Sequence, residues 1–503
     1  MSQIESSAAR PDLPPGEILG HPRALWQLFN IELWERFAFY GMRAILAVYV
    51  STQFFSHMGD QANAEASLVY GGYTALVYAT GLAGGYVADR ILGYRRSILL
   101  GAIIMAAGLF VLLIEDLHWF LVGLALVVAG NGLFKPNIST MVGKLYAQGD
   151  VRRDSGFTIF YMGINLGAFV APFVCASWVG VTWGMKWGFF AAGMGMILST
   201  LFMEWAKRSL GTVGLPPVDK QGWGRFFAVG AGALAMAFVV YFLLSASKVL
   251  GFLLVGVMIG LAVWFIISGI RLGKVQLHRY IAMLLLFLAN SCFWALFEQA
   301  GSSLNFFARE FTTPMYGGAE TWQAGGFGVF QSANPLYILM FAPLFAAMWP
   351  RLEKLGINPS IPRKFALGLF QVALGFLVLV WAIGNMQNAA GLVPWIFLAL
   401  CYLLHTTGEL CVSPIGLSMV TKLANEKETG LAMGGWFLSI AMAQYVAGII
   451  AAVASGGGGH GSALSGIDQY SDTYMQLFWL GLVFGIVYLV AAPFINKLMH
   501  GVK

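Results

Sequence analysis

The sequence predicts an all-α membrane protein with fourteen transmembrane helices, and three observations lead to this prediction. First, 58% of the 503 residues are hydrophobic and only 10% are charged, whereas soluble domains carry about 25% charged residues. Second, the chain contains a series of apolar segments, each about long enough to cross roughly 30 Å of hydrocarbon. Third, the basic residues are distributed unevenly between two sets of loops. The mean hydropathy of +0.74 agrees with this class.

Each apolar segment predicts one helix, because a chain inside lipid must satisfy its backbone hydrogen bonds within the segment. Residues 1–23, which precede the first apolar segment, lack the apolar stretch of a signal peptide, so we expect no cleaved signal peptide. We interpret these residues as a disordered cytoplasmic tail. The expected helices, in order, are 24–52, 64–92, 97–114, 118–146, 155–179, 183–206, 226–246, 249–272, 280–309, 324–350, 362–386, 393–423, 430–454 and 472–499.

The basic residues predict the topology. Of the 29 Lys and Arg residues, only Lys186, Lys248 and Arg309 fall on one set of loops. Apart from the few that lie inside predicted spans, the others fall on the opposite loops and in both tails. Because cytoplasmic loops are enriched in Lys and Arg, both termini are expected in the cytoplasm. This placement accounts for the pI near 9.0, so no nucleic-acid partner is expected.

An internal repeat indicates the domain organisation. The segments GNGLFKPNISTMVGKL at 130–145 and GELCVSPIGLSMVTKL at 408–423 share the pattern G-x5-P-x3-[ST]-M-V-x-K-L. Both copies end in Lys at a predicted cytoplasmic helix end, so the repeat is parallel, as between the halves of major facilitator carriers. We therefore expect a major facilitator fold with an N-terminal six-helix bundle at 24–206, a linker and two inserted helices at 207–279, and a C-terminal six-helix bundle with a short tail at 280–503.

Ionisable residues inside the predicted spans are candidates for function, because charges in lipid are costly and usually face a wet cavity on a substrate or proton route. The set is Glu32, Glu35, Arg36, Arg43, Lys135, Glu298 and Glu409. In the first helix, polar and aromatic residues recur at helical spacing and therefore share one face. These residues are Glu32, Glu35, Arg36, Phe39, Tyr40 and Arg43. The first helix is predicted to line a cavity.

The charge balance of this set suggests a mechanism. Its acids outnumber its bases by one when all are ionised. A surplus carboxylate in a buried site favours binding a proton, so we hypothesise that the site binds one or more protons together with a substrate. The cations Arg43 and Lys135 on one half and Glu409 on the other match a zwitterion. An amino acid, a short peptide and an amphoteric drug each satisfy this condition.

The chain resembles the proton-dependent oligopeptide transporter family along nearly its whole length. The most specific match is Glu32-x-x-Glu35-Arg36-Phe37-x-x-Tyr40-Gly41, which is similar to the first-helix motif of that family. The segment 85–96 resembles the general major facilitator loop motif, with Asp89, Arg90 and Arg95. Further matches are GNGLFKPNIS at 130–139, FYMGINLGAF at 160–169, FWALFEQ at 293–299, FQSANP at 330–335 and GELCVSPIGLS at 408–418.

The resemblance implies a proton-coupled symporter of di- and tripeptides in the inner membrane of a bacterium, with the peptide bound between the two bundles. It implies that Arg43 and Lys135 meet the peptide carboxylate, and that Glu409 meets the amino terminus. Asn165 and Asn334 would bind the peptide backbone, while Tyr40, Tyr78 and Trp436 would form side-chain pockets. Glu298 would be a proton site that is able to pair with Lys135. The coupling cluster would consist of Glu32, Glu35 and Arg36. The gate residues would be Asp89, Arg90 and Arg95. No cofactor or metal is implied, and the protein is expected to function as a monomer.

Several alternatives stay open from the sequence. Phe39 stands where many family members have Tyr, which leaves the side-chain selectivity open. Lys135 precedes Pro136 and could instead satisfy carbonyls freed by a kink, and Asn165 and Asn334 could be interhelical hydrogen-bond donors. Trp436 and Tyr78 could be packing aromatics. A carrier of another anionic or amphoteric solute, such as nitrate or a drug, is the alternative function. We expect no enzyme, since no nucleophile has a base at workable spacing.

Overall fold

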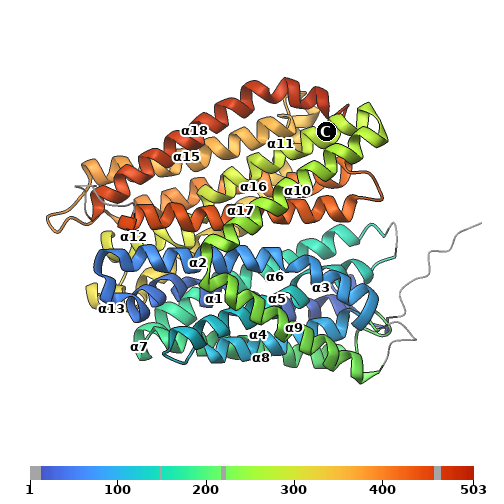
Figure 1. The fold of residues 1–503 in the computed structure, drawn as a ribbon, viewed down its shortest axis with the longest axis horizontal. Helices are drawn as coiled ribbons and strands as arrows, with labels where there is room; N and C mark the ends of the chain where they lie inside the picture. Colours follow the sequence, from blue (N-terminus) through green and yellow to red (C-terminus); the bar gives the residue numbers. More distant parts are fainter. Residues whose placement is uncertain (1–12, 148–149, 217–221, 458–465, 503) are drawn as a thin grey trace, which may run out of the picture. The chain divides into compact units, whose positions relative to one another are not determined.

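The computed structural model describes residues 13–147, 150–216, 222–457 and 466–502. Helices make up most of the described chain (Figure 1). Part of the predicted tail, at 1–12, and part of the predicted linker, at 217–221, lie outside the described residues.

The helices of the first half follow the predicted segments closely. Their bounds are α1 Arg23–Phe54, α2 Ala62–Ala79, α3 Gly81–Val87, α4 Tyr94–Val111, α5 Leu117–Lys144, α6 Arg153–Pro172, α7 Val181–Trp183 and α8 Met185–Ala206. Short 3-10 or π turns extend several of them, at Ser56–Gln61, Ala88–Leu92 and Phe173–Gly180.

The inserted helices and the second half also follow the prediction. The insert consists of α9 Trp223–Ser245 and α10 Ser247–Leu272. The remaining helices are α11 Lys274–Phe297, α12 Ser303–Phe311, α13 Ala319–Ala324, α14 Ala333–Lys354, α15 Ile361–Asn385, α16 Trp395–Leu423, α17 Thr429–Ala452 and α18 Ile467–Leu498. Short 3-10 or π turns also occur in this half, at Glu298–Gly301, Gly326–Ser332 and Val453–Gly457. The short helix α13 falls in what the sequence analysis treated as a loop.

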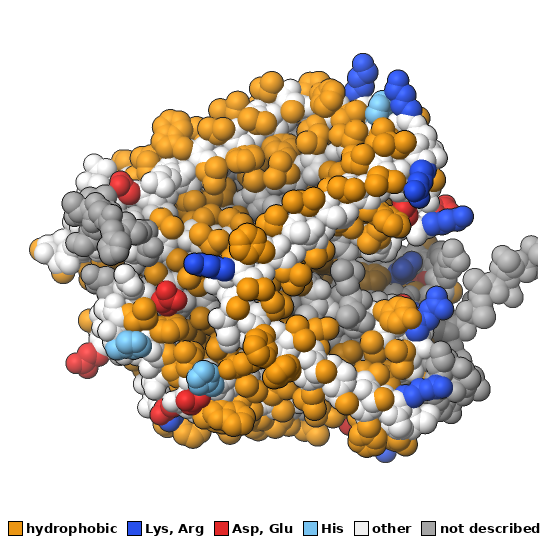
Figure 2. Space-filling model, in the orientation of Figure 1, with side chains coloured by type: hydrophobic (Ala, Val, Ile, Leu, Met, Phe, Trp, Pro, Cys, Tyr) orange, Lys and Arg blue, Asp and Glu red, His pale blue; other side chains and the backbone are white. Residues whose placement is uncertain are grey.

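The helix count supports an integral membrane protein. Within the described residues, 12 helical segments are long and apolar enough to cross a membrane. The charged helix α1 and the α2–α3 pair complete the predicted fourteen. The inserted helices are among the most apolar spans and are the least covered, with only 22% of the most apolar window of α9 and of α10 buried. Apolar side chains cover most of the face drawn in Figure 2, as contact with lipid tails requires.

Two predicted helices are broken in the structure. The helix expected at 64–92 stops at Ala79 and resumes at Gly81. The helix expected at 280–309 stops at Phe297, and α12 begins only at Ser303 after one 3-10 turn. Ser302 has φ −128° and ψ −95°, outside the helical region, which ends the hydrogen-bond ladder there. The prediction of one continuous helix over 280–309 was therefore wrong.

The tail preceding α1 is more ordered than expected. Glu17–Ile18 and His21–Pro22 pair as a two-stranded antiparallel hairpin, β1 and β2. The His21 ring is hydrogen bonded to the Tyr146 hydroxyl at 2.8 Å, and Arg152 donates to Glu17 at 2.8 Å. The expectation of disorder throughout 1–23 is thus corrected for residues 17–22. Contacts to the loop after α5, which the sequence pattern did not reveal, hold them.

The chain forms two compact units that do not coincide with its sequence halves. Unit 1 contains Met1–Met42, Thr80–Cys175 and Lys186–Phe242; unit 2 contains Arg43–Ala79, Ala176–Met185 and Leu243–Lys503. The division passes through α1, between Met42 and Arg43, and through α9, near its end. Unit 2 therefore includes the last part of α1 and all of α2 together with the second half of the chain.

Glycines let helices approach closely in both units. In unit 1, α4 and α5 cross at Gly101 and Gly130, where a Cβ on either residue would lie 2.6 Å from the carbonyl oxygen of the other. In unit 2, α2 and α17 cross at Gly71 and Gly448, where a Cβ on Gly71 would lie 2.7 Å from the Gly448 Cα. Such small residues at helix crossings are typical of membrane proteins.

The internal repeat lies on equivalent helices. Its two copies occupy the second parts of α5 and α16, and each helix continues through its proline, Pro136 or Pro414. Lys144 and Lys422 lie in the last turns of the two helices. The repeat therefore corresponds to the same local structure in both halves, as the pattern predicted.

Candidate functional site

In unit 1, the acidic and basic residues of α1 form one buried ion cluster. Arg36 Nη2 donates to Glu35 Oε1 at 2.7 Å, and Arg36 Nε lies 3.3 Å from Glu32 Oε1. All three side chains are at most 5% exposed. Their spacing on a single helix face is what the sequence predicted, and helix geometry brings them together without help from other elements.

Neighbouring helices hold this cluster in place. Asn131 of α5 donates to Glu35 at 3.4 Å, and the Phe39 ring lies under the Arg36 guanidinium at 5.1 Å. On α6, Gly167 leaves room for α1, since a Cβ there would overlap the Leu33 carbonyl. Phe39 thus supplies a cation–π contact to Arg36. The contact of Asn131 with Glu35 was not predicted from the sequence.

Lys135 of α5 completes the charge balance of unit 1. It lies close enough to Glu32 to interact with it electrostatically and is half-buried. The two carboxylates Glu32 and Glu35 are then matched by Arg36 and Lys135. The ionised cluster of unit 1 is neutral.

In unit 2, a second cluster is centred on the break between α11 and α12. Arg43, from the last part of α1, places Nη2 2.6 Å from Glu298 Oε2, with 12% and 3% of the two side chains exposed. Glu298 is the first residue after α11 ends. Broken helices that carry a charged group are a recurrent way to build transporter binding sites. The resemblance implied that Glu298 is able to pair with Lys135, which lies in unit 1; within unit 2, Glu298 forms an ion pair with Arg43.

Glu409 of α16 belongs to the same cluster. Asn334 of α14 donates to Glu409 Oε2 at 2.8 Å and to the Thr406 hydroxyl at 3.1 Å. Glu409 is also within electrostatic range of Glu298 and Arg43. Two carboxylates therefore face one guanidinium, and the ionised trio of Arg43, Glu298 and Glu409 carries a net charge of −1. The surplus acid predicted from the sequence lies in unit 2.

The remaining candidate substrate residues differ in their surroundings. Asn165 is buried and donates to the Tyr161 carbonyl one turn earlier on α6, at 3.0 Å. Tyr40 is half-buried beside Phe39, and Tyr78 is half-buried near the end of α2. Trp436 is 2% exposed and packs against Phe287 and Phe365, and its ring tip fills the space above Gly416. In this conformation Trp436 has the surroundings of a packing aromatic.

The three candidate gate residues also differ. The Tyr94 hydroxyl donates to Asp89, and Arg90 is exposed at the same helix end. Arg95 is buried and donates to the carbonyls of Val213, at 2.6 Å, and Gly211. Arg95 thus fastens the chain after α8 to the start of α4, within unit 1.

One half-buried acidic group was not predicted from the sequence. Glu310, assigned there to a loop, lies in α12 and accepts a hydrogen bond from Asn63 of α2 at 3.0 Å. Ser51 of α1 donates to the Asn63 side-chain oxygen at 2.5 Å. These residues join the end of α1 and the start of α2 to α12 within unit 2. Nothing in the local sequence pattern of Asn63 or Ser51 indicates this contact.

A membrane-embedded chain of long helices, with a repeated helix motif and buried charges on a broken helix, defines an integral membrane transporter. The chain belongs to the POT family, since residues 95–208 and 271–458 match the model described as "PTR2: POT family". It is 36% identical over 458 residues to the peptide transporter YePEPT of Yersinia enterocolitica, covering 86% of this chain and 88% of that protein. It is 30% identical over 498 residues to the dipeptide and tripeptide permease B of Aeromonas hydrophila, covering 98% and 96%.

The fold agrees with this membership. A crystal structure of a peptide transporter POT in complex with sulfate superposes with a TM-score of 0.79 at 36% sequence identity, covering 97% of this chain and 98% of that chain. The predicted major facilitator architecture and the family resemblance are both confirmed.

Proposed function

We propose that the protein is a proton-coupled symporter that imports di- and tripeptides by alternating access. We place it in the bacterial cytoplasmic membrane as a monomer with both termini in the cytoplasm. Membership of the POT family and the peptide-transporting relatives in Yersinia and Aeromonas support the substrate class. The observation that carries the proposal is the trio of Arg43, Glu298 and Glu409 in unit 2, in which two carboxylates face one cation.

The trio has the complementarity that a short peptide needs. A peptide zwitterion ends in an ammonium group and a carboxylate, and charge-assisted hydrogen bonds to both give affinity and orientation. Glu409 offers an anion for the ammonium group and is oriented by Asn334. Arg43 offers a fork of donors for the carboxylate. A free amino acid has the same charges closer together, so the separation of the two groups would select for length.

Proton coupling follows from competition for Arg43. Glu298 already occupies this guanidinium at 2.6 Å, so a peptide carboxylate can bind fully only when Glu298 gives up its negative charge. A proton on Glu298 removes the competitor, and a peptide carboxylate on Arg43 in turn makes the proton on Glu298 more favourable. This reciprocity is thermodynamic linkage between two ligands. The proton and the peptide therefore bind together.

The remaining candidates are assigned supporting roles in the same proposal. Lys135, Tyr40, Tyr78, Asn165, Asn334 and Trp436 would contact the peptide. The cluster of Glu32, Glu35 and Arg36, which Lys135 makes neutral, would transmit the charge state of the site along α1, which continues into unit 2 at Arg43. Asp89, Arg90 and Arg95 would act at the cytoplasmic gate.

Packing within unit 2 supports alternating access. α2 packs along α17 with Gly71 against Gly448, and Asn63 bonds Glu310. These contacts lie near the loops that carry few basic residues, which the positive-inside rule places outside the cell. We infer that the outer side is closed in this conformation, so that outward opening has to separate α2 from α17.

The proposal is tested by uptake into proteoliposomes. We expect labelled dialanine to accumulate only when an inward proton gradient is imposed, and unlabelled trialanine to compete while alanine and nitrate do not. The control is the same liposomes with a protonophore. Equal accumulation with and without the gradient would contradict proton coupling. Competition by nitrate and not by trialanine would contradict the substrate class.

A further inference from the structure

A hollow of about 300 Å³ lies in unit 1, outside the proposed transport site. It is formed by the start of α4, the chain after α8 and the first turn of α9. Its wall combines basic groups with apolar ones, among them Arg96, Lys207, Trp223 and Phe226.

Two cations of this hollow are available to a ligand. The Arg96 guanidinium lies over the exposed Trp223 ring, 5.1 Å from its centroid, with one long hydrogen bond of 3.4 Å to the Gly222 carbonyl. Lys207 pairs with Glu204, but both side chains are more than 40% exposed. An exposed pair of this kind contributes little and exchanges readily. The third basic residue, Arg95, is committed to backbone carbonyls.

The hollow lies at the membrane interface. α8 ends at Ala206, α4 begins at Tyr94 and α9 begins at Trp223, so three spans have their ends here, on the side that carries most of the basic residues. Tryptophan is enriched at the level of the lipid headgroups, and basic pockets between helices on this side bind anionic headgroups.

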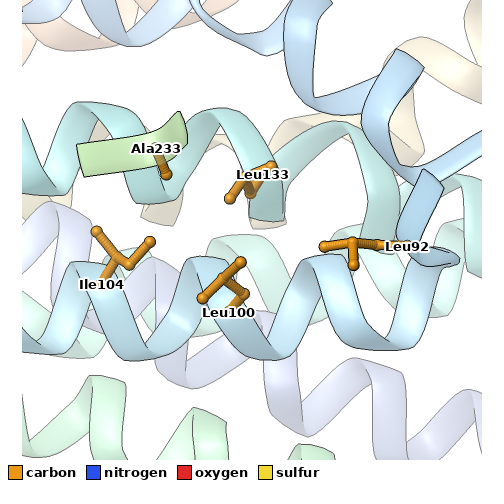
Figure 3. Packing of buried hydrophobic residues seen from close by; sticks show 5 residues of the cluster. All are labelled: Leu92, Leu100, Ile104, Leu133 and Ala233. Atoms are coloured by element: carbon orange, nitrogen blue, oxygen red, sulfur yellow. The ribbon is translucent and has the colours of Figure 1, made fainter. Parts of the chain in front are cut away.

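The helix that forms one wall is anchored on its inner face and open on its outer face. Ala233 of α9 packs into a cluster with Leu100, Ile104 and Leu133, and Leu92 completes it (Figure 3). Phe226 packs against the same cluster. On the outer face, Phe227 and Phe238 are 69% and 64% exposed. An acyl chain can therefore lie along α9 directly below the hollow.

We propose that this hollow binds an anionic phospholipid. The phosphate contacts Arg96 and Lys207, the glycerol region lies against Trp223, and the acyl chains run along the outer face of α9. A second hollow of about 340 Å³ on the other flank of α9 is lined by Thr80, Gly84, Gly132, Val229 and other uncharged residues. It lacks a partner for the phosphate, so the two flanks should differ in lipid preference.

The test uses the delipidated full-length protein in a neutral detergent. Binding of phosphatidylglycerol and of phosphatidylcholine with the same chains is measured by native mass spectrometry. We expect phosphatidylglycerol to bind more tightly. Each of Arg96→Gln and Lys207→Gln should weaken this binding by about five-fold, and the double variant by about thirty-fold. The matched control is Arg225→Gln, which removes a charge two residues after Trp223 but outside the lining.

Three results would overturn the proposal. One is equal affinity for the two lipids. Another is an equal loss in the Arg225→Gln control, which would show a general effect of surface charge. The third is displacement of the lipid by inorganic phosphate alone at the same concentration, which would show a site for free phosphate. Thermal melting of each variant shows whether it is folded, and Arg96→Lys, which keeps the charge, should retain most of the lipid preference.

Discussion

Replacing Glu298 with Gln should separate peptide exchange from concentrative uptake. The change keeps the shape of the side chain and removes its ability to carry a charge. Since Glu298 is the group that competes for Arg43 at 2.6 Å, the variant should bind peptide without needing a proton. Exchange of labelled against unlabelled dialanine should persist, whereas uptake against a gradient should be lost.

The loss of accumulation expected for Glu298→Gln follows from the driving force of the proton. If one proton accompanies each peptide, a gradient of one pH unit contributes about 1.4 kcal/mol, and 100 mV contributes about 2.3 kcal/mol. The sum of about 3.7 kcal/mol corresponds to an accumulation of about 500-fold, and the Glu298→Gln variant should fall to a ratio of about one. Stability should fall by about 1–3 kcal/mol, because the amide oxygen can still accept a hydrogen bond from Arg43 but no longer forms an ion pair.

The assay compares two modes in the same proteoliposomes. Accumulation is measured under an imposed proton gradient and potential, and exchange is measured with equal pH on both sides. Glu310→Gln is the matched control, since Glu310 lies outside the trio and the amide oxygen of Gln can still accept the hydrogen bond from Asn63; this variant should still accumulate peptide. If Glu298→Gln accumulates dialanine as the unmodified protein does, the competition for Arg43 is not the coupling step.

Three further predictions concern other contacts. Glu409→Gln should raise the KM for dialanine by about 10- to 100-fold, from loss of a charge-assisted bond of about 1.5–3 kcal/mol, but should change the KM for N-acetyl-dialanine little; an equal change for both would contradict the ammonium role. Gly71→Ala should destabilise the fold by about 1–3 kcal/mol, while Gly72→Ala, whose Cβ would meet nothing nearer than 3.6 Å, should not; equal melting midpoints would contradict the close helix crossing. Burial alone would raise the pKa of Glu428, but hydrogen bonds from Tyr280, Ser268 and Trp264 lower it overall. The resulting stabilisation is present at neutral pH and is lost as the pH falls through the folded-state pKa, so Glu428→Gln should lower the melting midpoint at pH 7, and the difference should shrink as the pH falls through that pKa.

Much of the fold could be predicted because a segment that crosses lipid as a helix must be apolar and must satisfy its own backbone hydrogen bonds. A span needs a run of apolar residues, and every predicted run is largely helical in the structure, although the helices expected at 64–92 and 280–309 are each interrupted. The ion cluster on α1 was also predictable, since Glu32, Glu35 and Arg36 lie on one face of a single helix whatever its neighbours are.

The pairing of residues from different helices could not be predicted in the same way. The Arg43–Glu298 ion pair depends on a break in the helix expected at 280–309. That segment contains no proline, so the sequence does not indicate the break. The Asn131–Glu35 and Asn63–Glu310 contacts likewise depend on which helices pack together. Helical periodicity identifies the face of a residue but not the partner that this face meets.

The inserted helices have a mechanical consequence. Most of α9 belongs to unit 1 and α10 belongs to unit 2, and only Ala246, with φ −125° and ψ 64°, separates them. Glu428 fastens α10 through Ser268 and Trp264, and the cluster around Leu133 fastens α9. A connection of one residue between two anchored helices can bend at Ala246 but can stretch little.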